Sequence, residues 1–95
     1  MQIISTKLVR KLVRSIAGDN IYGKSYTDIN LTNNDLRNVT FFVYEHKARE
    51  LAKEIEATLF IAGYKNKVKV TTSKVHTNGF GGDNTYLRIN NCVLG

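Results

Sequence analysis

At 95 residues the chain is long enough for one domain and too short for a second hydrophobic core. Hydrophobic residues make up 42% of it and charged residues 23%, with no proline, which excludes wholesale disorder and collagen-like or proline-rich classes. Its 14 lysine and arginine residues outnumber eight acids, and the formal charge of +6 favours an acidic partner such as nucleic acid, an anionic membrane surface or an acidic protein.

The single cysteine excludes an internal disulfide framework and a cysteine-rich zinc site. We therefore expect an intracellular, cytoplasmic protein. No window approaches the roughly 18 uninterrupted apolar residues of a membrane span, so we expect no membrane partner.

The first predicted helix spans residues 6–17. Ser5 or Thr6 supplies an N-cap, and Gly18 stands where a left-handed C-terminal cap is expected. Apolar residues recur at three- and four-residue steps, namely Leu8, Val9, Leu12, Val13 and Ile16. The opposite face carries four cations, Lys7, Arg10, Lys11 and Arg14. We favour a folded helix over a basic transit peptide, and its cationic face is either a solvated surface or a contact for a nucleic-acid backbone.

Two strands are predicted next. Residues 24–31 form a weak strand, and the polar run at residues 32–35 has turn character. Residues 39–44 form a clearer strand with two apolar faces, which is typical of a central strand or of a surface that meets a partner.

A second helix is predicted over residues 46–62, ending at Gly63. Alternating residues then predict strands over 67–75 and 85–93, with Leu87, Ile89 and Val93 facing inward. Residues 76–84 between these strands are predicted to form a loop longer than a usual hairpin turn.

This order of elements, α-β-β-α-β-β, predicts an α+β fold. We expect a single domain over residues 1–95, a two-layer sandwich with a four-stranded antiparallel sheet and two helices on one face. The uncovered face would then collect aromatic and basic side chains, namely Phe42, Tyr44, Tyr86, Lys67, Lys69 and Arg88, and with them Tyr26. Such a face suits single-stranded nucleic acid, but it could also be dry core or a dimer interface.

The glycine-rich connector contains Phe80, which is either a partner anchor or a ring that folds back on the core. Its string Asn78-Gly79-Phe80-Gly81 resembles part of the RNA-recognition-motif signature. Asn78 and Gly82 depart from that signature, and the strand order differs, so we do not assign the family.

The sequence contains no catalytic motif, and we expect no enzyme, no cofactor and no metal. His46 and Glu50 lie one turn apart, but two ligands do not make a zinc site. Cys92 lies in a predicted strand without an evident histidine and acid beside it, so it is not expected to be a nucleophile.

Three functional classes remain. We favour a stoichiometric binding protein that blocks an acidic protein or a nucleoprotein machine. In general character the chain resembles accessory proteins of phages and mobile elements, including anti-CRISPR inhibitors of host defence. The alternatives are a single-stranded nucleic-acid-binding domain and a homo-oligomeric subunit, such as a homodimer. The predicted contact residues are Lys7, Arg10, Lys11, Arg14, Lys69, Phe80, Tyr86 and Arg88.

Overall fold

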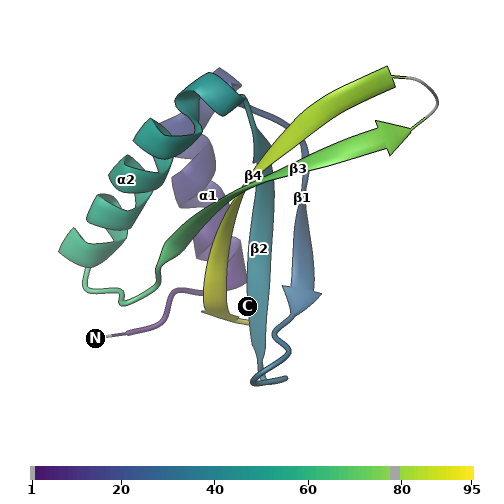
Figure 1. Ribbon diagram of the computed structural model, residues 1–95. Helices are drawn as coiled ribbons and strands as arrows, with labels where there is room; N and C mark the ends of the chain where they lie inside the picture. Colours follow the sequence, from purple (N-terminus) through teal and green to yellow (C-terminus); the bar gives the residue numbers. More distant parts are fainter. Residues whose placement is uncertain (1, 78–79) are drawn as a thin grey trace.

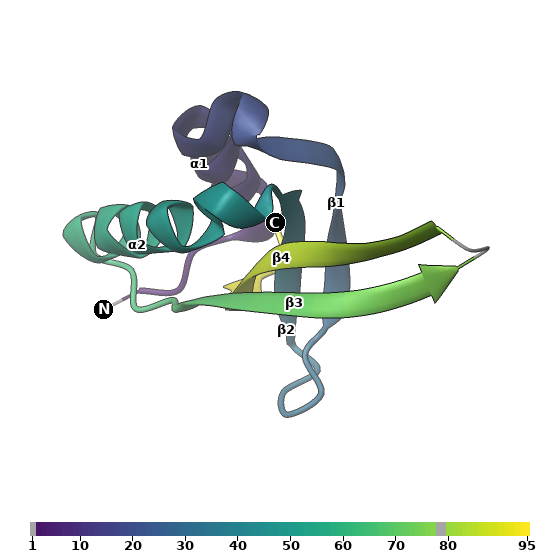
Figure 2. The same cartoon turned by 45° about the horizontal axis from the view of Figure 1, so that its top comes forward.

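The structure is a computed structural model that describes residues 2–77 and 80–95, with side chains described for 2–72 and 84–95. Its elements are α1 (Thr6–Ala17), the short 3-10 helix η1 (Gly18–Asn20), β1 (Ile21–Ile29), β2 (Leu36–Val43), α2 (Glu45–Ile61), β3 (Val68–Thr77) and β4 (Phe80–Val93). The strands lie in the order β1-β2-β4-β3, and every neighbouring pair is antiparallel. Both helices lie on one face of this sheet (Figures 1 and 2), so the predicted α+β sandwich is confirmed.

The first helix has the predicted bounds, and its N-terminus is capped by Ser5, whose hydroxyl accepts a hydrogen bond from the Leu8 amide at 3.2 Å. Its buried stripe differs from the prediction, because Thr6 is buried and Leu8 is 43% exposed. The Thr6 hydroxyl donates to the carbonyl of Gly95 at 3.1 Å. This contact with the C-terminal segment holds Thr6 against the body of the protein, which turns Leu8 toward solvent.

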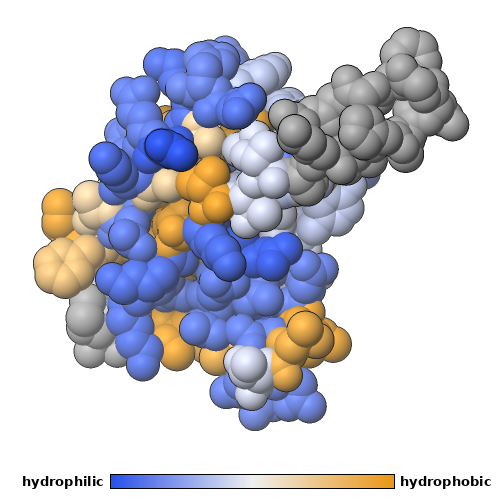
Figure 3. Space-filling view, viewed as in Figure 1, coloured by the Kyte–Doolittle hydropathy of each residue, from blue (hydrophilic) through white to orange (hydrophobic). Residues whose placement is uncertain are grey.

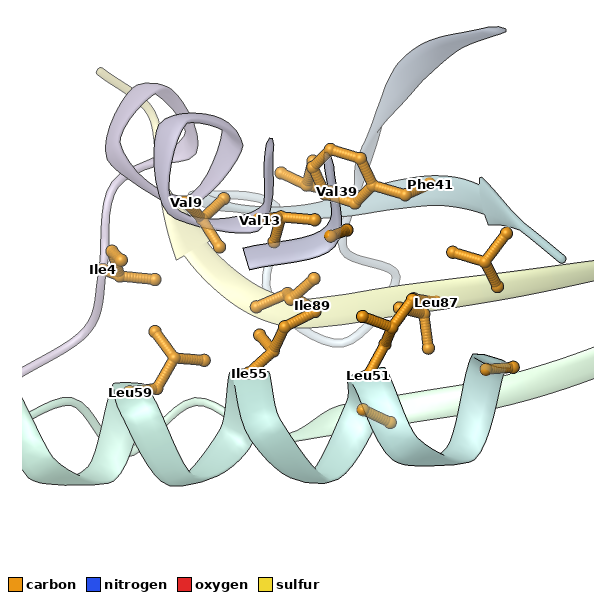
Figure 4. Close-up of a cluster of buried hydrophobic side chains, with 14 of the residues drawn as sticks. Ile4, Val9, Val13, Val39, Phe41, Leu51, Ile55, Leu59, Leu87 and Ile89 are labelled. Atoms are coloured by element: carbon orange, nitrogen blue, oxygen red, sulfur yellow. The ribbon is translucent and has the colours of Figure 1, made fainter. Parts of the chain in front are cut away.

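One hydrophobic core fills the space between the helices and the sheet, as Figure 4 shows. Helix α2 buries residues at helical spacing, and the alternate residues of β2 and β4 that face it are buried as well. The largest buried side chains include Phe41, Ile4, Ile55, Leu59, Leu87 and Ile89. None of the helices of the described chain is both long enough and apolar enough to cross a membrane.

Two strand predictions need correction at their ends. Strand β1 begins at Ile21, three residues before the predicted start. Near the end of β4, Asn91 has a φ of 62° and the pairing with β2 shifts register. This irregularity reverses the alternation that follows, so Cys92 is fully buried and Val93, predicted to face inward, is 38% exposed.

The connector predicted over residues 76–84 is also wrong as a loop. Strands β3 and β4 pair as far as Thr77 and Phe80. Thr85 is the first residue of β4, in chain order, that pairs with β2. The part of β4 before Thr85 therefore pairs only with the part of β3 that follows Thr72. The resulting two-stranded arm extends past the sheet (Figure 1). Gly81 and Gly82 pair within this ladder, opposite His76 and Val75, whereas Asn78 and Gly79 lie outside the described residues.

A buried asparagine joins three segments at the other end of the molecule. Asn66 accepts a hydrogen bond from the Ile4 amide at 2.9 Å through Oδ1. Its Nδ2 donates to the carbonyls of Asn90 and Asn91 at 2.8 and 3.1 Å. Only 5% of Asn66 is exposed, so these bonds form away from water and their loss would leave buried polar groups unpaired.

We therefore expect Asn66→Ala to lower the free energy of unfolding by about 3 kcal/mol, the cost of leaving a buried donor and buried acceptors without partners. Urea denaturation followed by circular dichroism measures this change. Asn34→Ala is the matched control, because Asn34 is exposed in the loop after β1, and it should change stability by less than about 0.5 kcal/mol. Equal effects of the two substitutions would contradict this role for Asn66.

Candidate functional site

Five aromatic side chains form a continuous layer on the face of the sheet opposite the helices. This ring layer consists of Tyr22, Tyr26, Phe42, Tyr44 and Tyr86. The centroid of Phe42 lies 5.9 Å from that of Tyr22 and 5.0 Å from that of Tyr86. Tyr26 meets Phe42 edge-on at 5.3 Å, and Tyr44 lies 5.1 Å from Tyr22. These separations are typical of attractive ring pairs, so each ring supports its neighbours.

Strand register explains the centre of the layer. Tyr22 of β1, Phe42 of β2 and Tyr86 of β4 lie directly opposite one another across three adjacent strands. Their neighbours Phe41 and Leu87 point to the other face and are buried in the core. The predicted alternation of residues 39–44, with Phe42 on the outer face, is therefore confirmed.

A bulge in β1 brings a second tyrosine into the layer. Tyr22 pairs with Phe42 and Tyr26 pairs with Thr40, so four steps along β1 match two along β2. Without the extra residues Tyr26 would lie opposite Asn38, two positions farther from Phe42. Gly23 lies within the bulge with a φ of +69°, a conformation that L side chains rarely adopt. The bulge and Tyr22 were both missed by the sequence reasoning, which began this strand at residue 24.

Cations lie beside the rings. Arg88 of β4 lies opposite Lys69 of β3, and both are on the face of the ring layer. The Nε of Arg88 donates to Oγ1 of Thr40 at 3.3 Å, which holds the guanidinium near Phe42 and Tyr86. The structure thus brings together three of the residues predicted for binding, Lys69, Tyr86 and Arg88.

A shallow hollow of about 250 Å³ lies within this face. Its lining residues are Tyr26, Asp28, Thr40, Phe42, Tyr86 and Arg88. Thr40 is buried and forms the floor, while β1 and β4 supply side chains on either side of it. The hollow therefore combines apolar ring surface with a carboxylate, a hydroxyl and a guanidinium.

The four predicted contact residues of α1 belong to a different surface. Lys7, Arg10, Lys11 and Arg14 belong to α1, and Figure 2 shows that this helix lies on one side of the sheet together with α2. The ring layer is on the other side of the sheet. Arg10 also donates to the hydroxyl of Thr27 on β1, so its guanidinium is engaged at the edge of the sheet. The predicted set is therefore not one site but two basic surfaces. The eighth predicted residue, Phe80, is the first residue of β4, and its side chain lies outside the described residues.

Other exposed apolar groups are scattered. Figure 3 shows hydrophobic residues near the C-terminal end of α2 and near the end of β1. Phe60 and Ile61 of α2 are exposed, as are Ile29 and Leu31 at the far end of the sheet. The ring contacts among the described residues involve none of these four side chains, which distinguishes them from the ring layer.

The described side chains considered for catalysis form no common cluster. Glu50 forms an ion pair with Lys47 at 3.6 Å, and the ring of His46 lies tilted against that of Tyr44, with 6.1 Å between the centroids, at the start of α2. Among the described side chains, those of residues 2–72 and 84–95, no group of three or more potential metal ligands is present. The imidazole of His76 lies outside the described side chains.

Cys92 is buried in the core. Its Sγ donates to the carbonyl of Ile89 at 3.6 Å and accepts from Nδ2 of Asn66 at 3.9 Å. Burial raises the pKa of the thiol to about 11, while the charge of Arg10 lowers it by less. The thiol is therefore protonated at neutral pH and is a poor nucleophile.

Comparison with protein-family models, with curated proteins and with solved structures finds no match for this chain. Its function therefore has to be inferred from the geometry and chemistry of the ring layer and its neighbouring charges.

The β1 bulge provides a test of how the ring layer is positioned. Gly23→Ala should lower the free energy of unfolding by about 1 to 2 kcal/mol, because alanine is strained at this positive φ. A new Cβ would meet nothing within 4 Å, so the cost comes from the backbone and not from a clash. Gly23→Asn should retain more stability, since asparagine tolerates this conformation better. Thermal unfolding of the three proteins measures the difference, and an alanine variant as stable as wild type would contradict the expected strain.

The buried thiol predicts a specific pH dependence. Its folded pKa of about 11 lies above the ordinary value of 9.0, so its contribution to stability is fully present below pH 9 and is lost as pH rises toward 11. Between pH 8.5 and 11 the wild type should lose more stability than Cys92→Ala, by at most about 2 to 3 kcal/mol. Urea denaturation at several pH values measures both slopes, and parallel slopes would show that the thiol has no raised pKa.

Proposed function

We propose that this chain is a non-enzymatic protein that acts by stoichiometric binding to a nucleoprotein complex, and that its ring layer takes an unpaired strand of the nucleic acid. The observation that carries this proposal is the ring layer itself, five partly exposed rings in mutual contact beside Arg88 and Lys69. Bases stack on such rings with about 1 to 3 kcal/mol each, while cations attract the phosphates.

The net charge of the chain supports a nucleic-acid partner over a neutral protein. A charge of +6 on 95 residues raises the rate of encounter with a polyanion, and phosphates are the densest negative charges that it would meet. The four cations of α1 contribute to this field from the other side of the sheet. They assist approach, whereas the ring layer forms the contact that holds the strand.

A role as an inhibitor is consistent with this mode of binding. A small protein that binds the exposed nucleic-acid strand of a larger nucleoprotein complex blocks that complex without any covalent bond being made or broken. Phages and mobile elements use such stoichiometric inhibitors against host defence, and we place this chain in that functional class as part of the proposal. An acidic protein surface and a second copy of the chain are the competing occupants of the same face, since tyrosine and arginine are also enriched at protein interfaces.

Paired substitutions on the two surfaces test the proposal. Tyr26→Ala should weaken binding of a labelled single-stranded 12-mer about tenfold through lost stacking, whereas Phe60→Ala, which removes an exposed ring from α2, should change it less than twofold. Arg88→Gln should weaken binding more than Arg14→Gln, although both remove one positive charge. Fluorescence anisotropy at physiological salt measures all four. Equal losses for the two arginine variants would assign binding to charge alone and contradict the role of the sheet face.

Two further measurements separate the competing occupants. Capture of partners from a host lysate, with and without nuclease, distinguishes a nucleic-acid contact from a protein contact, because a partner retained after digestion is bound through protein. A mass in solution of twice the monomer that is lost in Phe42→Asp would identify the ring layer as a dimer interface instead.

A further inference from the structure

The hollow on the sheet face has two polar ends that the ring layer does not explain. Asp28 of β1 and Arg88 of β4 both line it, on opposite sides of the floor residue Thr40. Asp28 is exposed, and in the part of the chain that the structure describes it forms no ion pair with Arg88. A carboxylate is an unfavourable group on a surface that only attracts phosphates, so its place in the hollow calls for a ligand that donates hydrogen bonds.

We propose that this hollow is a base-specific subsite that prefers guanine, with Asp28 and Arg88 as its specificity-determining residues. The inference rests on the proposed binding of a single strand and adds the identity of the preferred base. Guanine carries two adjacent donors, N1–H and the N2 amino group, which match the two oxygens of a carboxylate. It also carries the acceptors O6 and N7, which match a guanidinium.

The environment of Arg88 leaves it able to make these contacts. Its Nε is used in the bond to Thr40, and the guanidinium has four further N–H donors. The bond to Thr40 also limits the rotation of the side chain, which reduces the entropy lost when a base binds. Tyr26 and Phe42, which meet edge-on, line the same hollow and supply apolar surface against the ring of the base.

Other bases satisfy this pair of residues less well. Thymine and uracil have one N–H donor between two carbonyls, and those carbonyl oxygens repel a carboxylate. Cytosine and adenine each have an amino group for Asp28, but neither has the adjacent ring N–H that guanine adds. The expected order of binding is therefore guanine first, cytosine and adenine next, and thymine or uracil last.

The test uses the full chain and labelled single-stranded DNA nonamers. All positions of each nonamer carry thymine except the central one, which carries guanine, hypoxanthine or thymine. One guanine in each strand avoids the four-stranded assemblies of guanine-rich DNA. Fluorescence anisotropy should show the guanine nonamer bound about 10- to 100-fold more tightly than the all-thymine nonamer, the range expected for one bidentate base contact. Hypoxanthine lacks the N2 amino group and should fall between them.

Asp28→Asn should reduce the preference for guanine to less than about threefold and remove the difference between guanine and hypoxanthine, while binding of the all-thymine nonamer stays equal or rises. Asp35→Asn is the matched control, because it makes the same change of charge on an exposed loop residue and should keep the full preference. Arg88→Lys retains the positive charge but loses the planar set of N–H donors, so this variant should also lose the preference for guanine.

The outcomes distinguish this inference from the proposed function. Ring-dependent binding of all nonamers with equal affinity would overturn the guanine subsite and leave strand binding intact. A preference for guanine that persists in Asp28→Asn would overturn the role of Asp28. If no nonamer binds to the wild type, the proposed binding of a single strand fails, and the base-specific subsite fails with it.

Discussion

The packing of both helices against one face of the sheet is the constraint on which the rest of the molecule depends. Each helix has a single apolar stripe, and each of the central strands β2 and β4 alternates its side chains between two faces. Burying Phe41 and Leu87 under the helices therefore turns Phe42 and Tyr86 to the opposite side. Both helices lie on the other side of the sheet, and none of the other elements that the structure describes covers these rings (Figures 1 and 2). The exposed ring layer is thus a direct consequence of how the core forms.

Mutual contact is how five rings remain on a surface that faces solvent. Rings that pack edge-on or tilted against one another hide part of their apolar area from water, and each such pair contributes about 0.5 to 1.5 kcal/mol beyond burial alone. The layer still leaves Tyr26 more than half exposed. It is consequently both a stabilising element of the sheet and a surface that can gain free energy when a flat apolar partner covers it.

The two basic surfaces differ in what they can recognise. Cations on an exposed helix face act at a distance and are screened by salt, so they contribute mainly to the rate of encounter. Arg88 is different, because its bond to Thr40 fixes the guanidinium beside the rings. Asp28 completes this contrast, since a single acid among the cations weakens the general attraction to phosphates while allowing a particular base to be chosen.

How much could be predicted from the sequence follows from the range of the interactions involved. Apolar periodicity, caps and alternation are local, and they were sufficient to predict both helices, four strands, the two-layer arrangement and the outward direction of Phe42, Tyr86 and Arg88. The long arm was missed because glycine and asparagine weaken a strand locally, whereas pairing between β3 and β4 outweighs that preference.

The composition of the site was decided by tertiary structure. Gly23 and the bulge around it place Tyr26 against Phe42, and register alone brings Asp28 and Arg88 to the same hollow across 60 residues of chain. The packing of α1 on the opposite face of the sheet separates its cations from those of the strands, although both sets look alike as sequence. Local patterns determine which face of the sheet a side chain occupies. Only the pairing of distant strands determines which side chains lie next to it, because that pairing is set by contacts between residues far apart in the sequence.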